Sequence, residues 1–103
     1  MFDFSPEKKD KYYARGEQYL EDNAITYLQI DRSRFGVCGR AHEVHLYLVP
    51  FYRKTVTKAQ LQHAKGLENI VITNDRFSRH KPGTPYPLRE NGYVRLLLDE
   101  EDR

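Results

Sequence analysis

The sequence predicts an α+β fold: an N-terminal helix packed on a four- to five-stranded, mainly antiparallel sheet, with a short second helix. Two observations carry this prediction. Residues 5–23 have helical spacing of their apolar side chains behind a capping serine, and residues 44–51 form a mostly apolar run that suits a strand. A chain of 103 residues is long enough for one domain and too short for two, so residues 1–103 are expected to form a single domain.

The first helix is predicted from its start signal and its apolar stripe. Ser5 suits the N-cap and Pro6 the first helical position, and an acid follows them. Gly16 falls within the stripe, where the missing side chain lets a helix approach a sheet closely. The helix is expected to end near residues 22–23. Its inward side chains are Tyr12, Tyr13, Gly16, Tyr19 and Leu20.

The run VHLYLVPF at residues 44–51 predicts the central strand. Eight residues rich in valine, leucine and aromatics, with Pro50 near the end, favour a strand over a helix. Alternation puts Val44, Leu46 and Leu48 on one aliphatic face, which is expected to cover the core. The other face carries His45, Tyr47, Val49 and Phe51 and is expected to be only partly covered.

The remaining elements follow from shorter patterns. Thr57 suits the N-cap of a helix over residues 58–65, with Gly66 as a C′ glycine. Residues 34–38 fit either a short strand before a turn at Gly39-Arg40, which we favour, or part of one long hairpin loop. Residues 99–103 are expected to be a frayed tail. Further strands are predicted over residues 24–31, 67–73 and 93–98.

Charge is distributed unevenly along the chain. The net charge is +2, yet residues 1–31 carry −3, residues 32–95 carry +8 and residues 96–103 carry −3. If the fold separates these segments, the basic middle attracts a polyanion or an acidic protein surface. A solvated surface without a partner is the alternative.

The strongest functional signal is the connection over residues 74–92, nineteen residues without a helical or strand period. Basic side chains and aromatic rings alternate in it, and no acid lies between residues 76 and 89. Arginine binds phosphates through paired donors and aromatic faces stack on bases, although the same mixture suits an acidic protein partner. The candidate binding residues here are Arg76, Phe77, Arg79, His80, Lys81, Tyr86 and Arg89, and a second basic group around Phe35 consists of Arg32, Arg34 and Arg40.

Two chemical alternatives remain open. Cys38, His42 and His45 are chemically suitable zinc ligands, but their spacing is not that of a familiar finger and a buried thiol with two rim histidines is favoured. His80, His63 or His45 beside cationic side chains could serve a small metal-independent endoribonuclease. No catalytic residue and no cofactor is assigned.

The sequence therefore favours a non-enzymatic interaction module. Its basic, arginine- and tyrosine-rich surface would meet an acidic protein, a nucleoprotein complex or a nucleic acid. Accessory and inhibitor proteins of phages and mobile elements are commonly of this size and kind. A single cysteine and the lack of a long apolar run indicate a cytoplasmic chain without a membrane contact. The sequence leaves the oligomeric state open.

Overall fold

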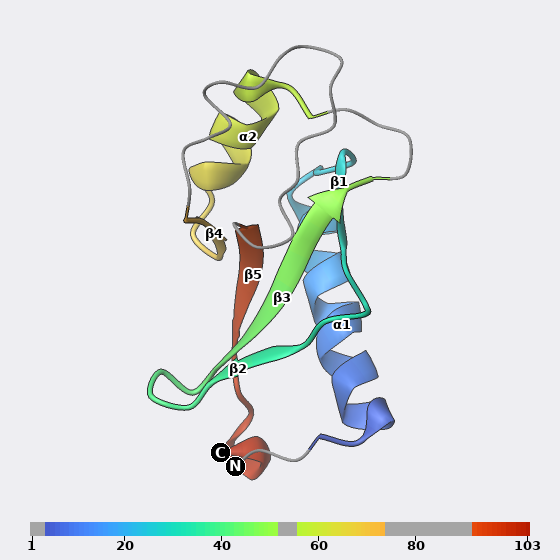
Figure 1. Cartoon of the computed structure of the whole chain (residues 1–103), viewed down its shortest axis with the longest axis vertical. Coiled ribbons are helices and arrows are strands. Elements are labelled where there is room, and N and C mark those ends of the chain that lie inside the picture. The colour runs from blue at the N-terminus through green and yellow to red at the C-terminus, as the bar shows by residue number, and fades with distance from the viewer. Residues whose placement is uncertain (1–3, 52–55, 74–91) are drawn as a thin grey trace.

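A computed structural model of the chain describes residues 4–51, 56–73 and 92–103, and shows an α+β fold (Figure 1). An N-terminal helix packs on a five-stranded antiparallel sheet, and a short second helix follows the longest strand, as predicted. The elements are α1 (Pro6–Asp22), β1 (Leu28–Ile30), β2 (Gly36–Cys38), β3 (Glu43–Pro50), α2 (Lys58–Lys65), β4 (Ile70–Ile72), β5 (Gly92–Leu97) and the 3₁₀ helix η2 (Glu100–Asp102).

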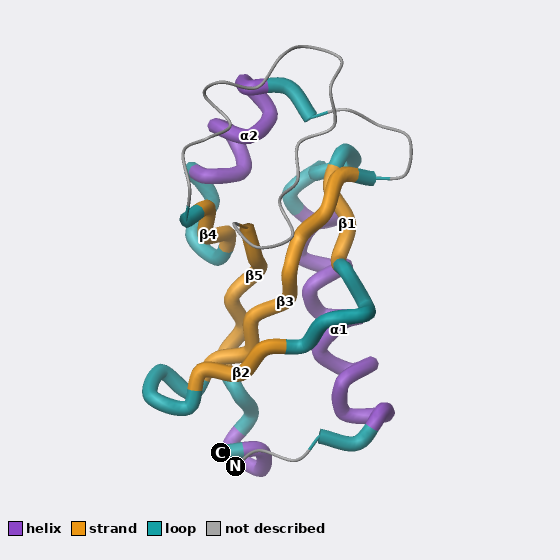
Figure 2. The backbone as a smooth tube through the Cα atoms, viewed as in Figure 1, coloured by secondary structure: helices purple, strands orange, loops and turns teal. Residues whose placement is uncertain are grey.

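The sheet is built around β3, which pairs with three other strands (Figure 2). On one side, β1 pairs with residues 48–50 of β3 and β2 with residues 43–45. On the other side, β5 pairs with residues 43–47 and in turn with β4. The strand that the sequence marked as central is therefore the centre of the sheet.

Helix α1 lies against the aliphatic face of β3. The side chain of Ser5 accepts a hydrogen bond from the Lys8 amide at 3.3 Å, Pro6 occupies the first turn and Asn23 is the C-cap, as predicted. Val44, Leu46 and Leu48 are fully buried and share one core cluster with Tyr12 and the other inward residues of α1. Gly16 is the point of closest approach, since a Cβ atom there would lie 2.5 Å from Leu46 Cδ1 and 3.3 Å from Ile30 Cδ1.

This close approach predicts a large effect of a branched side chain at residue 16. Gly16→Val is expected to destabilise the protein by about 1–3 kcal/mol, because the added methyl groups overpack a core that has no room for them. Ala14→Val is the matched control, because Ala14 is exposed on the same helix and receives the same β-branched residue. Equal melting temperatures of the two variants would contradict a tight contact at Gly16.

Three predicted strands are shorter than expected, and the one predicted over residues 34–38 spans only Gly36–Cys38. The chain leaves α1 through Ala24, which has a φ of 56°, and the Ile25 amide bonds back to the Leu20 carbonyl at 2.9 Å. Residues 24–27 therefore form the exit from a helix, and the strand is confined to Leu28–Ile30. Similarly, the Ile70 amide bonds to the Leu67 carbonyl at 3.3 Å, so a turn replaces the first part of the strand predicted over residues 67–73.

Helix α2 has the predicted bounds and a stronger start than predicted. The Thr57 hydroxyl accepts from the Gln60 amide at 3.1 Å, and the Gln60 side chain accepts from the Thr57 amide at 2.9 Å, which completes a capping box. Gly66 ends the helix, but as a right-handed C-cap with a φ of −75°. The prediction of a C′ glycine is therefore wrong, because no left-handed residue is needed there.

The C-terminal residues are not a frayed tail. They form η2 and dock on α1, so that the Tyr12 hydroxyl donates to Asp102 Oδ2 at 2.6 Å and accepts from the Asp99 amide at 3.1 Å. Lys8 Nζ lies 2.8 Å from Asp102 Oδ1, and Lys11 Nζ lies 2.8 Å from Asp99 Oδ2. Asp102 is buried within this network. The acids of the C-terminal end are thus paired with lysines of α1. The net charges of the separate segments did not indicate this pairing.

None of the described helices combines the length and the apolar character that crossing a membrane requires.

Candidate functional site

The face of the sheet opposite α1 is the candidate functional site, and we call it the open face. Strand register defines it, because paired residues share a face. α1 lies on the other side of the sheet, behind β3 in Figure 1. The residues of the open face are half-buried or exposed, in contrast to the buried row beneath them. They include Gly36, Cys38, Glu43, His45, Tyr47, Val71, Tyr93, Arg95 and Leu97.

A continuous row of planar groups crosses this face from Arg34, just before β2, to β5. Tyr47 and Tyr93 are direct partners in the ladder, with ring centroids 6.3 Å apart and a T-shaped arrangement. His45 stacks on Tyr93 at 4.2 Å with 23° between the planes. The Arg34 guanidinium lies over the Tyr47 ring, 4.2 Å from its centroid. We call Arg34, Tyr47, Tyr93 and His45 the planar row.

Gly36 gives the planar row its shape on the β2 side. A Cβ atom at Gly36 would lie 3.1 Å from the Tyr47 hydroxyl oxygen and 3.2 Å from Tyr47 Cε2. The ring of Tyr47 therefore lies against the bare backbone of β2, within reach of Arg34. Because a side chain at residue 36 would crowd the ring, the glycine is needed for close approach rather than for an unusual backbone angle.

Two charged side chains, Glu43 on β3 and Arg95 on β5, lie next to His45 at the end of the planar row. Glu43 Oε1 lies 3.2 Å from His45 Nε2, and Glu43 Oε2 lies 3.4 Å from Arg95 Nε. The carboxylate thus holds an imidazole and a guanidinium beside each other. Burial, with a smaller contribution from Glu43, raises the pKa of Tyr93 above its usual value, so its phenol stays neutral at physiological pH.

The structure separates the three arginines that the sequence grouped around Phe35. Arg34 joins the open face, and Arg40 lies exposed in the turn between β2 and β3. Arg32 turns to α1, where its Nη2 atom lies 2.6 Å from Glu17 Oε1 and its Nη1 atom 3.4 Å from Asp10 Oδ1. The Arg32 guanidinium also lies 5.4 Å from the centroid of the Tyr13 ring. Its charge is therefore compensated within the α1 layer.

The other candidate residues lie outside the described residues, in the segment that joins β4 to β5. They are Arg76, Phe77, Arg79, His80, Lys81, Tyr86 and Arg89. The two attachment points of the segment are described, because Ile72 and Gly92 are paired in the ladder. The next pair along the ladder is Val71 and Tyr93. The basic segment thus leaves and rejoins the sheet one residue from the planar row.

Sequence reasoning missed Glu43, Tyr47, Tyr93 and Arg95 as site residues and considered His45 only as a base or a ligand. The signal that locates them is alternation, since residues 45 and 47 share the partly covered face of residues 44–51. The same period of two in β5 places residues 93 and 95 together. Which partner strand faces them depends on the topology, which alternation does not give.

Within the described residues, His, Cys, Asp and Glu side chains approach one another closely enough to hold a metal ion only at Asp99, Glu101 and Asp102. Their ligand atoms lie within 4.8 Å of one another, but Lys8 and Lys11 already occupy these carboxylates. Cys38 pairs across the ladder with Glu43, and His42 has a φ of 54° in the preceding turn. The described geometry gives the zinc alternative no support.

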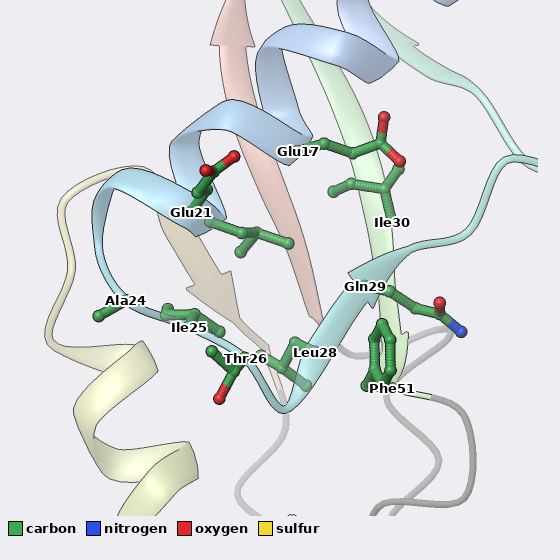
Figure 3. Close-up of a pocket in the computed structure, with 10 residues that line it drawn as sticks. Glu17, Glu21, Ala24, Ile25, Thr26, Leu28, Gln29, Ile30 and Phe51 are labelled. Carbon is green, nitrogen blue, oxygen red and sulfur yellow. The ribbon is translucent and has the colours of Figure 1, made fainter.

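A pocket of about 300 Å³ lies between the end of α1 and β1 (Figure 3). Its apolar lining comprises Leu20, Ile25, Leu28, Ile30 and Phe51. Phe51 is 42% exposed, and Glu17 and Glu21 also line the pocket. It contains none of the residues of the planar row.

Comparison of the chain with models of protein families, with curated proteins and with solved structures finds no match.

Proposed function

We propose that the protein is a non-enzymatic module that binds nucleic acid through the open face and the basic segment attached beside it. The observation that carries the proposal is the planar row, in which the guanidinium of Arg34, just before β2, is followed by two phenol rings and an imidazole on β3 and β5. Guanidinium groups bind phosphate oxygens through paired donors, and aromatic faces stack on bases.

The distribution of ion pairs supports this assignment. Lys8, Lys11 and Arg15 are paired with acids of the C-terminal segment, and Arg32 is paired with acids of α1. These four cations are therefore compensated on the α1 side of the sheet. The open face carries Arg34, which lies over the Tyr47 ring, and Arg95, which contacts Glu43, while Arg40 lies in the adjacent turn and the basic segment adds further cations in the sequence. A negatively charged partner is attracted to that side.

The proposal predicts a salt-dependent affinity that depends on the arginines of the open face. We expect the double variant Arg34→Gln, Arg95→Gln to bind a fluorescent RNA oligonucleotide more weakly at every salt concentration. The slope of log affinity against log salt should fall by about one for each phosphate contact removed. Fluorescence anisotropy over a salt series measures both quantities.

Lys58→Gln is the matched control, because Lys58 is an exposed cation on α2, away from the open face. This variant should bind like the parent protein. Polyglutamate provides the second control, since it offers negative charge without bases or phosphates. Polyglutamate that displaces the RNA at equal charge concentration would point to an acidic protein as the partner and would count against nucleic acid.

An endoribonuclease is the second candidate, favoured by the contact of His45 with Glu43 and of Glu43 with Arg95. An imidazole beside a carboxylate suits proton transfer, and arginine suits the scissile phosphate. In-line displacement at phosphorus also needs a base and an acid on opposite sides of the phosphate. His45 and Glu43 are hydrogen-bonded to each other, so together they can place a proton donor or acceptor on only one side of the phosphate. We therefore rank the nuclease activity second.

Incubation of structured RNA with the protein in EDTA separates the two candidates. We expect no new fragments at protein concentrations that saturate binding. Fragments that appear in EDTA and disappear with His45→Gln would establish the nuclease instead.

A further inference from the structure

We infer that the open face selects single-stranded nucleic acid over duplex, with unpaired bases stacked on Tyr47 and Tyr93 and the phosphates beside Arg34 and Arg95. This inference rests on the proposed function and specifies the form of the ligand. It depends on the geometry of the planar row, whereas the proposed function depends mainly on its charge.

The first step concerns the rings. Tyr47 and Tyr93 stand directly opposite each other on neighbouring strands, and both are half-buried rather than fully covered. Adjacent strands lie about 4.8 Å apart, so the two rings form neighbouring positions on one surface. Sheets that carry aromatic rings in this way stack about two or three unpaired bases. The planar row has the length for such a segment.

The second step concerns rigidity. The Tyr93 ring has His45 stacked on one face, and the Tyr47 ring has the Arg34 guanidinium over one face and the Gly36 backbone against its hydroxyl edge. Neighbouring planar groups and backbone fix both rings before any ligand arrives. A fixed ring loses little conformational entropy on binding, which favours stacking as a source of affinity.

The third step excludes duplex. In a duplex the base faces are stacked on one another, and only their edges are accessible from the grooves. Rings that belong to the surface of a sheet cannot insert between paired bases without unstacking them. A duplex therefore reaches the arginines with its phosphates but gains nothing from Tyr47 and Tyr93.

The charged groups lie where a backbone would pass. Arg34 forms the β2 end of the planar row, and Arg95 faces His45 across the ladder, two residues after Tyr93 on β5 and in contact with Glu43. A strand whose bases cover the two tyrosines then has cationic side chains at both ends of the contact. This chemistry is shared by RNA and single-stranded DNA, and the experiment must distinguish them.

The test compares four probes of one mixed sequence: single-stranded RNA, single-stranded DNA, the DNA annealed to its complement, and a DNA strand with abasic sites at successive positions. The abasic strand keeps the phosphates and loses the stacking partners. We expect tighter binding of at least one single strand than of the duplex, and weak binding of the abasic strand. The single strand bound more tightly identifies the ligand as RNA or DNA.

Variants of Tyr47 then assign the stacking to the planar row. Tyr47→Ala should weaken single-strand binding by about 5- to 150-fold, the loss that corresponds to one base stack. Tyr47→Phe should retain most of the affinity, because the ring remains. Binding of duplex and of the abasic strand should be nearly unchanged in both. Tyr93→Leu is a second variant, to be used with a melting curve, if Tyr47→Ala does not fold.

Different failures have different meanings. Duplex or abasic strand bound as tightly as the single strands would overturn the stacking inference and leave a phosphate-binding module in place. A folded Tyr47→Ala variant with parental affinity would do the same. No binding of any probe at low salt would overturn the proposed function itself, and with it this inference.

Discussion

Leu48→Ala is expected to lower the free energy of unfolding by about 2–5 kcal/mol, a large part of the stability of a domain of this size. Leu48 is fully buried at the centre of β3, and it pairs across the ladder with Ile30. Its side chain belongs to the core cluster beneath α1, so truncation leaves a cavity that the surrounding side chains fill only in part.

Urea or thermal unfolding measures this loss. Val49→Ala is the matched control, because Val49 is the next residue of the same strand and is only half-buried. It should cost much less than Leu48→Ala. A Leu48→Ala protein that melts within about one or two degrees of the parent would show that β3 is not the centre of the core.

Asp102→Asn is expected to lower the melting temperature at pH 7 by roughly 4–8 °C. The change removes the negative charge that forms ion pairs with Lys8 and Lys11 and accepts a hydrogen bond from the Tyr12 hydroxyl group. Glu101→Gln is the matched control. Glu101 belongs to the same segment and also contacts Lys11, but its side chain is 70% exposed, so its ion pair contributes little.

The same network predicts the direction of the pH dependence. Hydrogen bonds and ion pairs with Lys8, Tyr12 and Lys11 lower the pKa of Asp102 to about 2, from an ordinary value of 3.8. The folded state therefore binds this proton less readily than the unfolded state. The stabilisation is complete above about pH 4 and is lost as the pH falls toward 2. Asp102→Asn should flatten this part of the curve of stability against pH. A variant with an unchanged acid limb would exclude Asp102 as its source.

The parts of the fold that depend on local chemistry were predictable from the sequence. Ser5, Pro6 and Thr57 mark helix starts because their side chains or rings act on the backbone within three residues. The buried row of β3 follows from its alternation. The same holds for Gly16, whose position in an apolar stripe already indicated a close approach.

The features that the sequence did not predict depend on contacts between segments that are distant in the chain. The ends of β1 and β4 are set by hydrogen bonds from residues 25 and 70 back to the preceding turns, and propensity alone does not place such bonds. Asp102 looked like part of a charged tail because its partners lie 90 residues earlier in the chain. Arg32 and Arg34 are only two residues apart, yet they serve opposite faces of the sheet. Residues two apart in an extended chain share a face, so the separation comes from the turn in which the Arg34 amide donates to the Asp31 carbonyl at 3.3 Å.

The docking of η2 on α1 also has a consequence for synthesis of the chain. The Tyr12 hydroxyl is buried, and both of the hydrogen bonds given above join it to residues 99 and 102. A nascent chain that has not yet reached residue 99 must leave this hydroxyl hydrated or bury it at a cost. Helix α1 therefore completes its contacts only after residues 99–102 have been synthesised, and contacts of such long sequence separation slow folding.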